Sequence, residues 1–172
     1  MPDLDFQIVS VESLRDPGTP GLAFHLCVTN RVEKEPIHSI LLRCQIQIET
    51  PRRRYSAREQ QRLWDLFGEP ERWGQTLRSM LWANVSVNIP SFTGSVAHPV
   101  PIPCAFDLTD RTAKYFRALE GGDVPITFLF SGTVFYDSGT AGLQVAPVPW
   151  SKEARFRLPV EVWKAMESVE VS

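Results

Sequence analysis

V-P-I-T-F-L-F-S-G-T-V-F-Y, the stretch from Val124 to Tyr136, is the longest continuous run of apolar and β-branched residues in the chain. Apolar side chains occupy both of its alternating faces, a pattern that predicts a strand covered on both sides at the centre of a sheet. Its thirteen residues are too few to span a membrane, and Pro125 and Gly132 disfavour a buried helix. We therefore expect a central core strand that bends at Gly132.

The rest of the 172-residue chain has the composition of one folded domain. A chain of this length buries roughly 70% of its unfolded surface and needs no disulfide or metal to hold its core. Its 14 prolines and 10 glycines indicate many turns between short strands. The formal charge of −2 provides no overall attraction to nucleic acid or to an anionic membrane. We expect a single domain over residues 1–172, without nucleic-acid binding or membrane insertion.

The cysteines and the N-terminus indicate the compartment. Cys27, Cys44 and Cys104 are odd in number and lack C-x-x-C spacing, which fits reduced thiols in the cytosol. The N-terminal residues do not follow the secretory pattern of a basic segment before an apolar one. We expect a cytoplasmic protein.

Strict alternation marks the strands that flank the central run. Residues 22–28 and 40–48 are apolar at every second position. We expect these two segments to pair as antiparallel strands with one face exposed to solvent. Prolines at 99, 101 and 103 remove ladder donors on one side, so this piece is an edge strand or an extended strap. Residues 154–158 form a last strand with Arg155 and Arg157 pointing outward. The fold class expected is α+β, mainly β: an antiparallel β-sandwich of about eight strands with helical insertions and a short C-terminal helix.

Helical signals interrupt this pattern at three places. Ser56 and Glu59 form a capping box that begins a helix over residues 57–67, within a helical insertion at about 56–82. A second helix is expected at about 108–120, with Asp107 or Thr109 as its cap. Pro159 suits the first turn of the C-terminal helix.

Candidate catalytic and metal-binding patterns are weak. His25 and Cys27 share a strand face and could bind a metal with a third group, but a surface histidine beside a partly covered thiol is the alternative. Ser131 lacks the G-x-S-x-G context of a nucleophile elbow, and Gly121-Gly122 follows a helix, so it is not a phosphate-binding loop. We expect no catalytic residue, no cofactor and no metal, and therefore not an enzyme.

An arginine run offers a different kind of site. Arg52, Arg53 and Arg54 are followed at helical spacing by Arg58 and Arg62, a set that could hold a phosphate backbone. Acidic residues lie close by in the sequence, and such a run is usually a solvated face. We expect no nucleic-acid partner.

Three tryptophans spaced nine residues apart are more informative. Tryptophan and arginine together are enriched at protein–protein hot spots, so this region predicts a partner-binding surface. The residues assigned to this surface are Arg62, Trp64, Arg72, Trp73, Arg78 and Trp82. The alternative is that two of the three tryptophans form a satellite core under the insertion.

Four stretches together resemble an uncharacterised bacterial family whose genes accompany high-affinity, oxygen-tolerant nickel–iron hydrogenases of the actinobacterial type. These are D-L-D-F-Q-I-V at 3–9, I-L-L-R-C-Q-I-Q-I-E at 40–49, L-F-G-E-P-E-R-W-G-Q-T-L-R at 66–78 and L-F-S-G-T-V-F-Y at 129–136. The resemblance implies a non-catalytic accessory protein for assembly, maturation or scaffolding, with hydrogenase subunits or maturation factors as partners. It implies no site residues, because the family has no assigned activity.

A weaker similarity is to β-rich export chaperones, which have opening strands of the F-Q-I type and gather into tetramers. It implies a homo-oligomer that holds unfolded clients, the main alternative to an accessory protein. A metal-binding carrier or enzyme is the other alternative.

Overall fold

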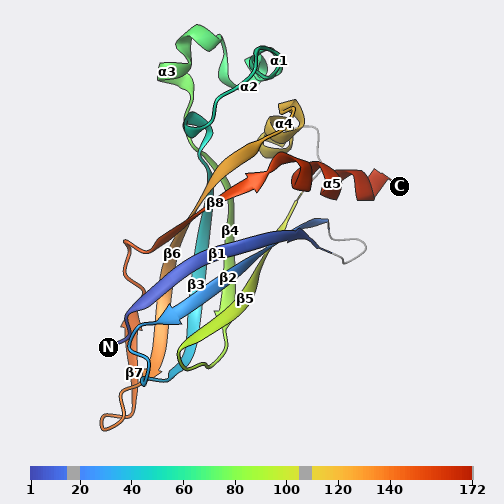
Figure 1. Cartoon of the computed structure of the whole chain (residues 1–172). Coiled ribbons are helices and arrows are strands. Elements are labelled where there is room, and N and C mark those ends of the chain that lie inside the picture. The colour runs from blue at the N-terminus through green and yellow to red at the C-terminus, as the bar shows by residue number, and fades with distance from the viewer. Residues whose placement is uncertain (15–19, 105–109, 172) are drawn as a thin grey trace.

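The computed structural model describes residues 1–14, 20–104 and 110–171, and its strands form two antiparallel sheets that pack face to face (Figure 1). In the three-stranded sheet the order is β1 (Leu4–Ser13), β2 (Gly21–Asn30) and β5 (Ser95–Pro103). In the five-stranded sheet the order is β4 (Met80–Ile89), β3 (Ile37–Ile48), β6 (Asp123–Asp137) and β7 (Leu143–Pro147), and β8 (Glu153–Pro159) also pairs with β6. The predicted antiparallel sandwich is confirmed.

Strand β6 is the central strand of the larger sheet. Strand β3 pairs with one of its edges, whereas β7 and β8 pair in succession along the other. At Gly132, the position of the predicted bend, φ is 136° and an added Cβ would lie 2.0 Å from the carbonyl oxygen of Leu41. One expectation was wrong: on the outward face Leu129 is only partly buried and Ser131 is exposed. Strand β6 is therefore central within its sheet but covered on one face.

Aromatic side chains fill the space between the sheets. Phe24 of β2 is fully buried and meets Phe128 edge-on at 5.1 Å between ring centroids. Phe6 of β1 stacks on Phe130 at 4.5 Å. Burial of each such ring is worth roughly 1.5–3 kcal/mol, so these cross-sheet contacts hold the two layers together.

The predicted pairing of residues 22–28 with residues 40–48 is wrong. Strand β2 pairs with β1 and β5, and β3 pairs with β4 and β6, so the link 31–36 crosses from one sheet to the other. Buried Asn30 fixes this crossing, since its Oδ1 accepts from the backbone N–H groups of Asp3 and Val32, both at 3.1 Å. Alternation identifies the buried face of a strand, but it does not identify the partner strand.

Strand β5 lies at an edge, as its prolines predict. Among the strands that the structure describes it pairs with β2 alone, and Pro99, Pro101 and Pro103 are exposed. The buried side chains between them, Val100 and Ile102, face the core.

The helices gather at one end of the sandwich (Figure 1). Between β3 and β4 lie η1 (Thr50–Arg52), α1 (Ala57–Arg62), α2 (Trp64–Phe67), η2 (Pro70–Arg72) and α3 (Trp73–Thr76). The capping box is confirmed: Ser56 Oγ accepts from the Glu59 N–H at 3.2 Å, and the Glu59 carboxylate accepts from the Ser56 N–H at 2.8 Å. The single helix expected over 57–67 is instead broken at Leu63, where φ is −90° and ψ is 0°.

Two further helices follow in the chain. Helix α4 (Arg111–Ala118) falls within the predicted range, and Asp110 caps it by accepting from the Thr112 N–H at 3.0 Å. The predicted caps Asp107 and Thr109 lie outside the described residues. Helix α5 (Val160–Val171) confirms the C-terminal helix, and its Trp163 stacks on Phe116 at 5.1 Å. Within the described ranges, no helix combines the length and apolar character needed to cross a membrane.

Candidate functional site

The predicted partner-binding residues divide into an exposed set and a buried set. Trp64 on α2 is 50% exposed. Arg62, Arg72 and Arg78 are also exposed. Trp73 is only 9% exposed. Trp82 is partly buried and lies on β4, because the insertion ends before Met80. The arrangement favours the satellite-core alternative for Trp73, whereas Trp82 lies outside the insertion.

Trp73 is the centre of that satellite core. Its Nε1–H donates to the carbonyl oxygen of Gly68 at 3.0 Å, and its ring meets Tyr55 edge-on at 5.4 Å. Phe67 packs against another edge at 6.1 Å. A buried indole with a satisfied N–H is typical of a structural residue.

A β-bulge explains why Trp82 turns inward. Ile46 of β3 lies opposite Ala83, and the next residue, Gln47, lies opposite Leu81, so Trp82 is the extra residue. Its ring then packs against Phe24 and Phe116 at 6.0 and 5.6 Å. Nothing in the local sequence pattern marks this bulge.

A buried ion pair anchors the helical insertion to the rest of the molecule. The side chains of Arg53 and Glu59 are 9% and 5% exposed, and two hydrogen bonds of 3.2 and 3.0 Å join them. Arg53 also donates to the carbonyl oxygens of Gly121 and Asp123, just before and at the start of β6. Glu59 accepts from the Glu120 N–H at 2.9 Å. The sequence did not predict this ion pair, because Arg53 lies between two exposed arginines in the chain.

The surroundings of Glu59 determine its ionisation. Burial raises the pKa of this carboxyl group, but hydrogen bonds from Arg53 and from the backbone N–H groups of Ser56 and Glu120 outweigh burial. The net effect is a pKa below the ordinary value, so Glu59 stays ionised and paired at neutral pH.

Two tyrosines extend this network without adding reactivity. The hydroxyl of Tyr55 donates to the carbonyl oxygen of Thr50 at 2.8 Å and lies 2.6 Å from the hydroxyl of Tyr115. Burial raises the pKa of Tyr55 to about 12 and also raises the pKa of Tyr115. Both hydroxyls therefore remain protonated and serve as structural links.

The metal candidates do not converge. His25 Nε2 lies 3.0 Å from a carboxylate oxygen of Glu12, and Cys27 is partly exposed. Cys44 and Cys104 are buried, and burial raises the pKa of each thiol to about 12. Among the residues that the structure describes, no group of three His, Cys, Asp or Glu side chains could hold a metal ion.

Sequence reasoning missed an exposed tryptophan. Trp150 is 91% exposed in the loop 148–152 that separates β7 from β8. The Val148 N–H donates to the carbonyl oxygen of Gly132 at 2.9 Å, and the Phe130 N–H donates to the carbonyl oxygen of Lys152 at 3.1 Å. The loop is thus hydrogen-bonded to β6 at both ends, with Trp150 at its tip.

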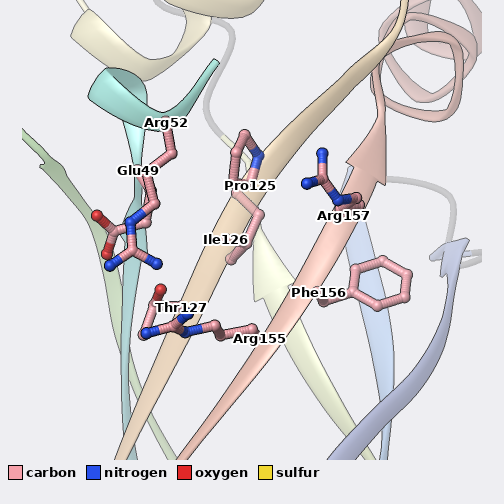
Figure 2. A pocket seen from close by; sticks show the side chains of 8 residues that line it. All are labelled: Glu49, Arg52, Pro125, Ile126, Thr127, Arg155, Phe156 and Arg157. Carbon is pink, nitrogen blue, oxygen red and sulfur yellow. The ribbon is translucent and has the colours of Figure 1, made fainter.

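A second missed feature is a pocket lined by arginines, which Figure 2 shows from close by. It has a volume of about 280 Å³. Its lining residues are Glu49, Arg52, Pro125, Ile126, Thr127, Arg155, Phe156 and Arg157. We call it the arginine pocket. Arg52 is distant in the sequence from Arg155 and Arg157, and the pairing of both β3 and β8 with β6 brings the three together.

A comparison with known protein families assigns the chain to one of them. The sequence profile of DUF6084, described as a family of unknown function, matches residues 1–170. The chain belongs to the DUF6084 family. No curated protein and no solved structure matches it.

Two surfaces of this DUF6084 protein are candidates for ligand binding. One is the helical end around Trp64, where an indole and arginines are exposed on a segment that the Arg53–Glu59 pair holds in place. The other is the arginine pocket on the outer face of the larger sheet. The first suits contact with a protein and the second suits an anion.

Proposed function

We propose that this DUF6084 protein is a non-catalytic accessory protein that binds a protein partner through the helical end around Trp64. The observation that carries the proposal is the half-exposed indole of Trp64 on a segment fixed by a buried ion pair. Tryptophan is among the residues most enriched at binding hot spots. A surface that is already ordered loses little conformational entropy when a partner docks.

The surroundings of Trp64 support this role. A groove of about 400 Å³ lies beside it, between α2 and α4. Its lining residues are Arg62, Asp65, Leu66, Lys114, Arg117 and Ala118. The groove combines an apolar floor with charges of both signs at its rim, which is the usual anatomy of a protein-binding site. Arg72 contributes a further positive charge to the same end of the molecule. Its ion pair with Glu69 is exposed and long at 3.9 Å, so the pair holds the Arg72 side chain only weakly.

The resemblance described above supplies the partner. We propose that it is a subunit of a nickel–iron hydrogenase or one of its maturation factors, and that the two meet in the cytoplasm. In this role the protein assists assembly, maturation or scaffolding and does no chemistry itself.

Affinity purification from the native host tests the proposal. Tagged wild-type chain is expected to retain hydrogenase or maturation polypeptides, identified by mass spectrometry, and Trp64→Ala is expected to lose them. Trp150→Ala is the matched control, because it removes another exposed indole from a loop between strands. Retention by Trp64→Ala at the wild-type level would refute the proposed surface. Retention of other proteins alone would refute the proposed partner.

An uncovered sheet face supports a holding chaperone as a second candidate. Leu41 and Val145 are 51% and 61% exposed on the larger sheet. Exposed apolar surface of this kind can bind unfolded clients or further copies of the chain. This candidate predicts a tetramer by light scattering and suppression of the aggregation of an unrelated protein. A monomer that leaves aggregation unchanged would exclude it.

A further inference from the structure

Arginines from two separate segments line the arginine pocket. Arg155 and Arg157 occupy alternate positions on β8, so both point to the outer face of the sheet. In the ladder they lie opposite Thr127 and Pro125 of β6, respectively. Arg52 comes from η1, which follows β3 on the other side of β6. The pocket therefore spans β8, β6 and the neighbouring η1.

The backbone fixes the approach of Arg52. The Glu49 N–H donates to the carbonyl oxygen of Pro125 at 2.9 Å, and the Arg52 N–H donates to Glu49 at 3.0 Å. These bonds place η1 beside the first residues of β6. Figure 2 shows the guanidinium groups of Arg52 and Arg155 near Glu49 and Thr127, with Arg157 on the other side of Pro125.

The positive charges in the pocket are poorly neutralised. Arg155 lies 3.8 Å from Glu153, and both side chains are largely exposed, so this contact is weak. Arg52 and Arg157 make no ion pair with any residue in the described ranges. Glu49, the one carboxylate in the lining, accepts from Ser79 Oγ at 2.6 Å. Three positive charges against one negative charge leave the pocket at +2, in a chain whose formal charge is −2.

We propose that the arginine pocket binds a phosphomonoester group. Guanidinium groups bind phosphate oxygens in a bidentate way, and a phosphomonoester carries about two negative charges at neutral pH, which matches the charge of the pocket. The carboxylate of Glu49 would accept a hydrogen bond from a hydroxyl or amino group on the same ligand. The volume of about 280 Å³ is at the lower limit of small-molecule sites, so it suits a phosphate with a few further atoms.

This site goes beyond the proposed accessory function and is independent of it. It lies on the outer sheet face and contains none of the residues around Trp64. The phosphate group could come from a small phosphorylated metabolite or from a phosphorylated side chain of a protein, since the chemistry of recognition is shared.

Calorimetric titration with three probes tests the proposal. The probes are inorganic phosphate, glycerol phosphate and a short phosphoserine peptide, in a phosphate-free buffer of low ionic strength. We expect saturable binding of at least one of them to the wild-type chain. Loss of one charge-assisted contact weakens binding roughly tenfold, so Arg155→Ala and Arg157→Ala each lower the affinity by about that factor. Tighter binding of glycerol phosphate identifies a metabolite as the source, and tighter binding of the peptide identifies a protein.

Arg43→Ala is the matched control, because Arg43 is exposed on the same sheet face, outside the pocket. Its affinity for the probes is expected to equal that of the wild type. Thermal unfolding of each variant without ligand shows that the fold is intact. Phosphate is expected to raise the unfolding temperature of Arg155→Ala and of Arg157→Ala less than that of the wild type and of Arg43→Ala. Absence of saturable binding for all three probes would overturn the proposal. Unchanged affinity of the double variant Arg155→Ala, Arg157→Ala for the probes would also overturn the proposal. Tighter binding of malonate, a dicarboxylate, than of phosphate would overturn it as well.

Discussion

The guanidinium group of Arg53 forms a bidentate pair with the carboxylate of Glu59, with Nη1 3.2 Å from Oε1 and Nη2 3.0 Å from Oε2. The pair joins the start of the helical insertion to the segment 120–123, because both side chains also bond to its backbone. The position of the insertion on the sandwich therefore depends on two side chains in direct contact.

Removal of either partner is expected to destabilise the fold strongly. Arg53→Ala or Glu59→Ala leaves a buried charge without its partner, which typically costs about 3–5 kcal/mol. The measurement is the free energy of unfolding from urea titration. Arg54→Ala is the control, since Arg54 is exposed, and it is expected to change the free energy by less than about 0.5 kcal/mol. Equal effects of Arg53→Ala and Arg54→Ala would contradict the assignment.

The lowered pKa of Glu59 predicts a loss of stability in acid. A carboxyl group with a lower pKa in the folded state stabilises the protein above its unfolded pKa, and this contribution disappears as the pH falls through the folded pKa. The difference in unfolding free energy between the wild type and Glu59→Gln is therefore expected to be constant near neutrality and to shrink below about pH 4.3, the ordinary glutamate pKa. Urea titrations at a series of pH values check this. A difference that stays constant down to the acid transition would argue against it.

Gly132 is expected to tolerate no side chain. An added Cβ would lie 2.0 Å from the Leu41 carbonyl oxygen in the adjacent strand, and φ is in the region that favours glycine. Gly132→Ala is thus expected to lower the unfolding temperature markedly or to prevent folding. Gly74→Ala is the control, because no atom lies within 4 Å of its added Cβ and α3 accommodates alanine. It is expected to be neutral or to stabilise by about 0.4–1 kcal/mol. Similar melting curves for the two variants would refute the close contact.

Truncation of Trp73 is expected to destabilise the fold far more than truncation of Trp64. Trp73→Ala removes a buried ring from the satellite core, a change that typically costs about 3–5 kcal/mol. Trp64→Ala removes a half-exposed ring and is expected to cost far less. Unfolding free energies of the two variants provide the test. A larger loss for Trp64→Ala would show that Trp64 belongs to the core and would also remove the basis for the proposed partner surface.

Alternation of apolar residues was sufficient to predict the fold class and the central position of β6. It could not predict that β2 and β3 belong to different sheets, because the same alternation suits either partner. The apolar residues Leu129 and Phe135 also predicted that the outer face of β6 is covered. That prediction was wrong, because both side chains are only partly buried. A local pattern describes one strand, whereas pairing depends on every strand at once.

The candidate site was harder to predict than the fold. Trp64 was identified from its sequence neighbours, but the bulge that buries part of Trp82 leaves no local signal. Arg53 stands in a run whose other members are exposed, so its buried pairing with Glu59 was hidden. The arginine pocket depends on strand pairing between distant segments, which composition and spacing do not reveal.

The prolines of β5 affect how the protein behaves when many copies are crowded together. Pro99, Pro101 and Pro103 leave one border of the smaller sheet without amide hydrogens at alternate positions. A strand from another chain needs those N–H donors to pair with the edge of the sheet. Their absence therefore blocks fibril growth from this edge. Freshly synthesised chains can thus accumulate without polymerising along β5.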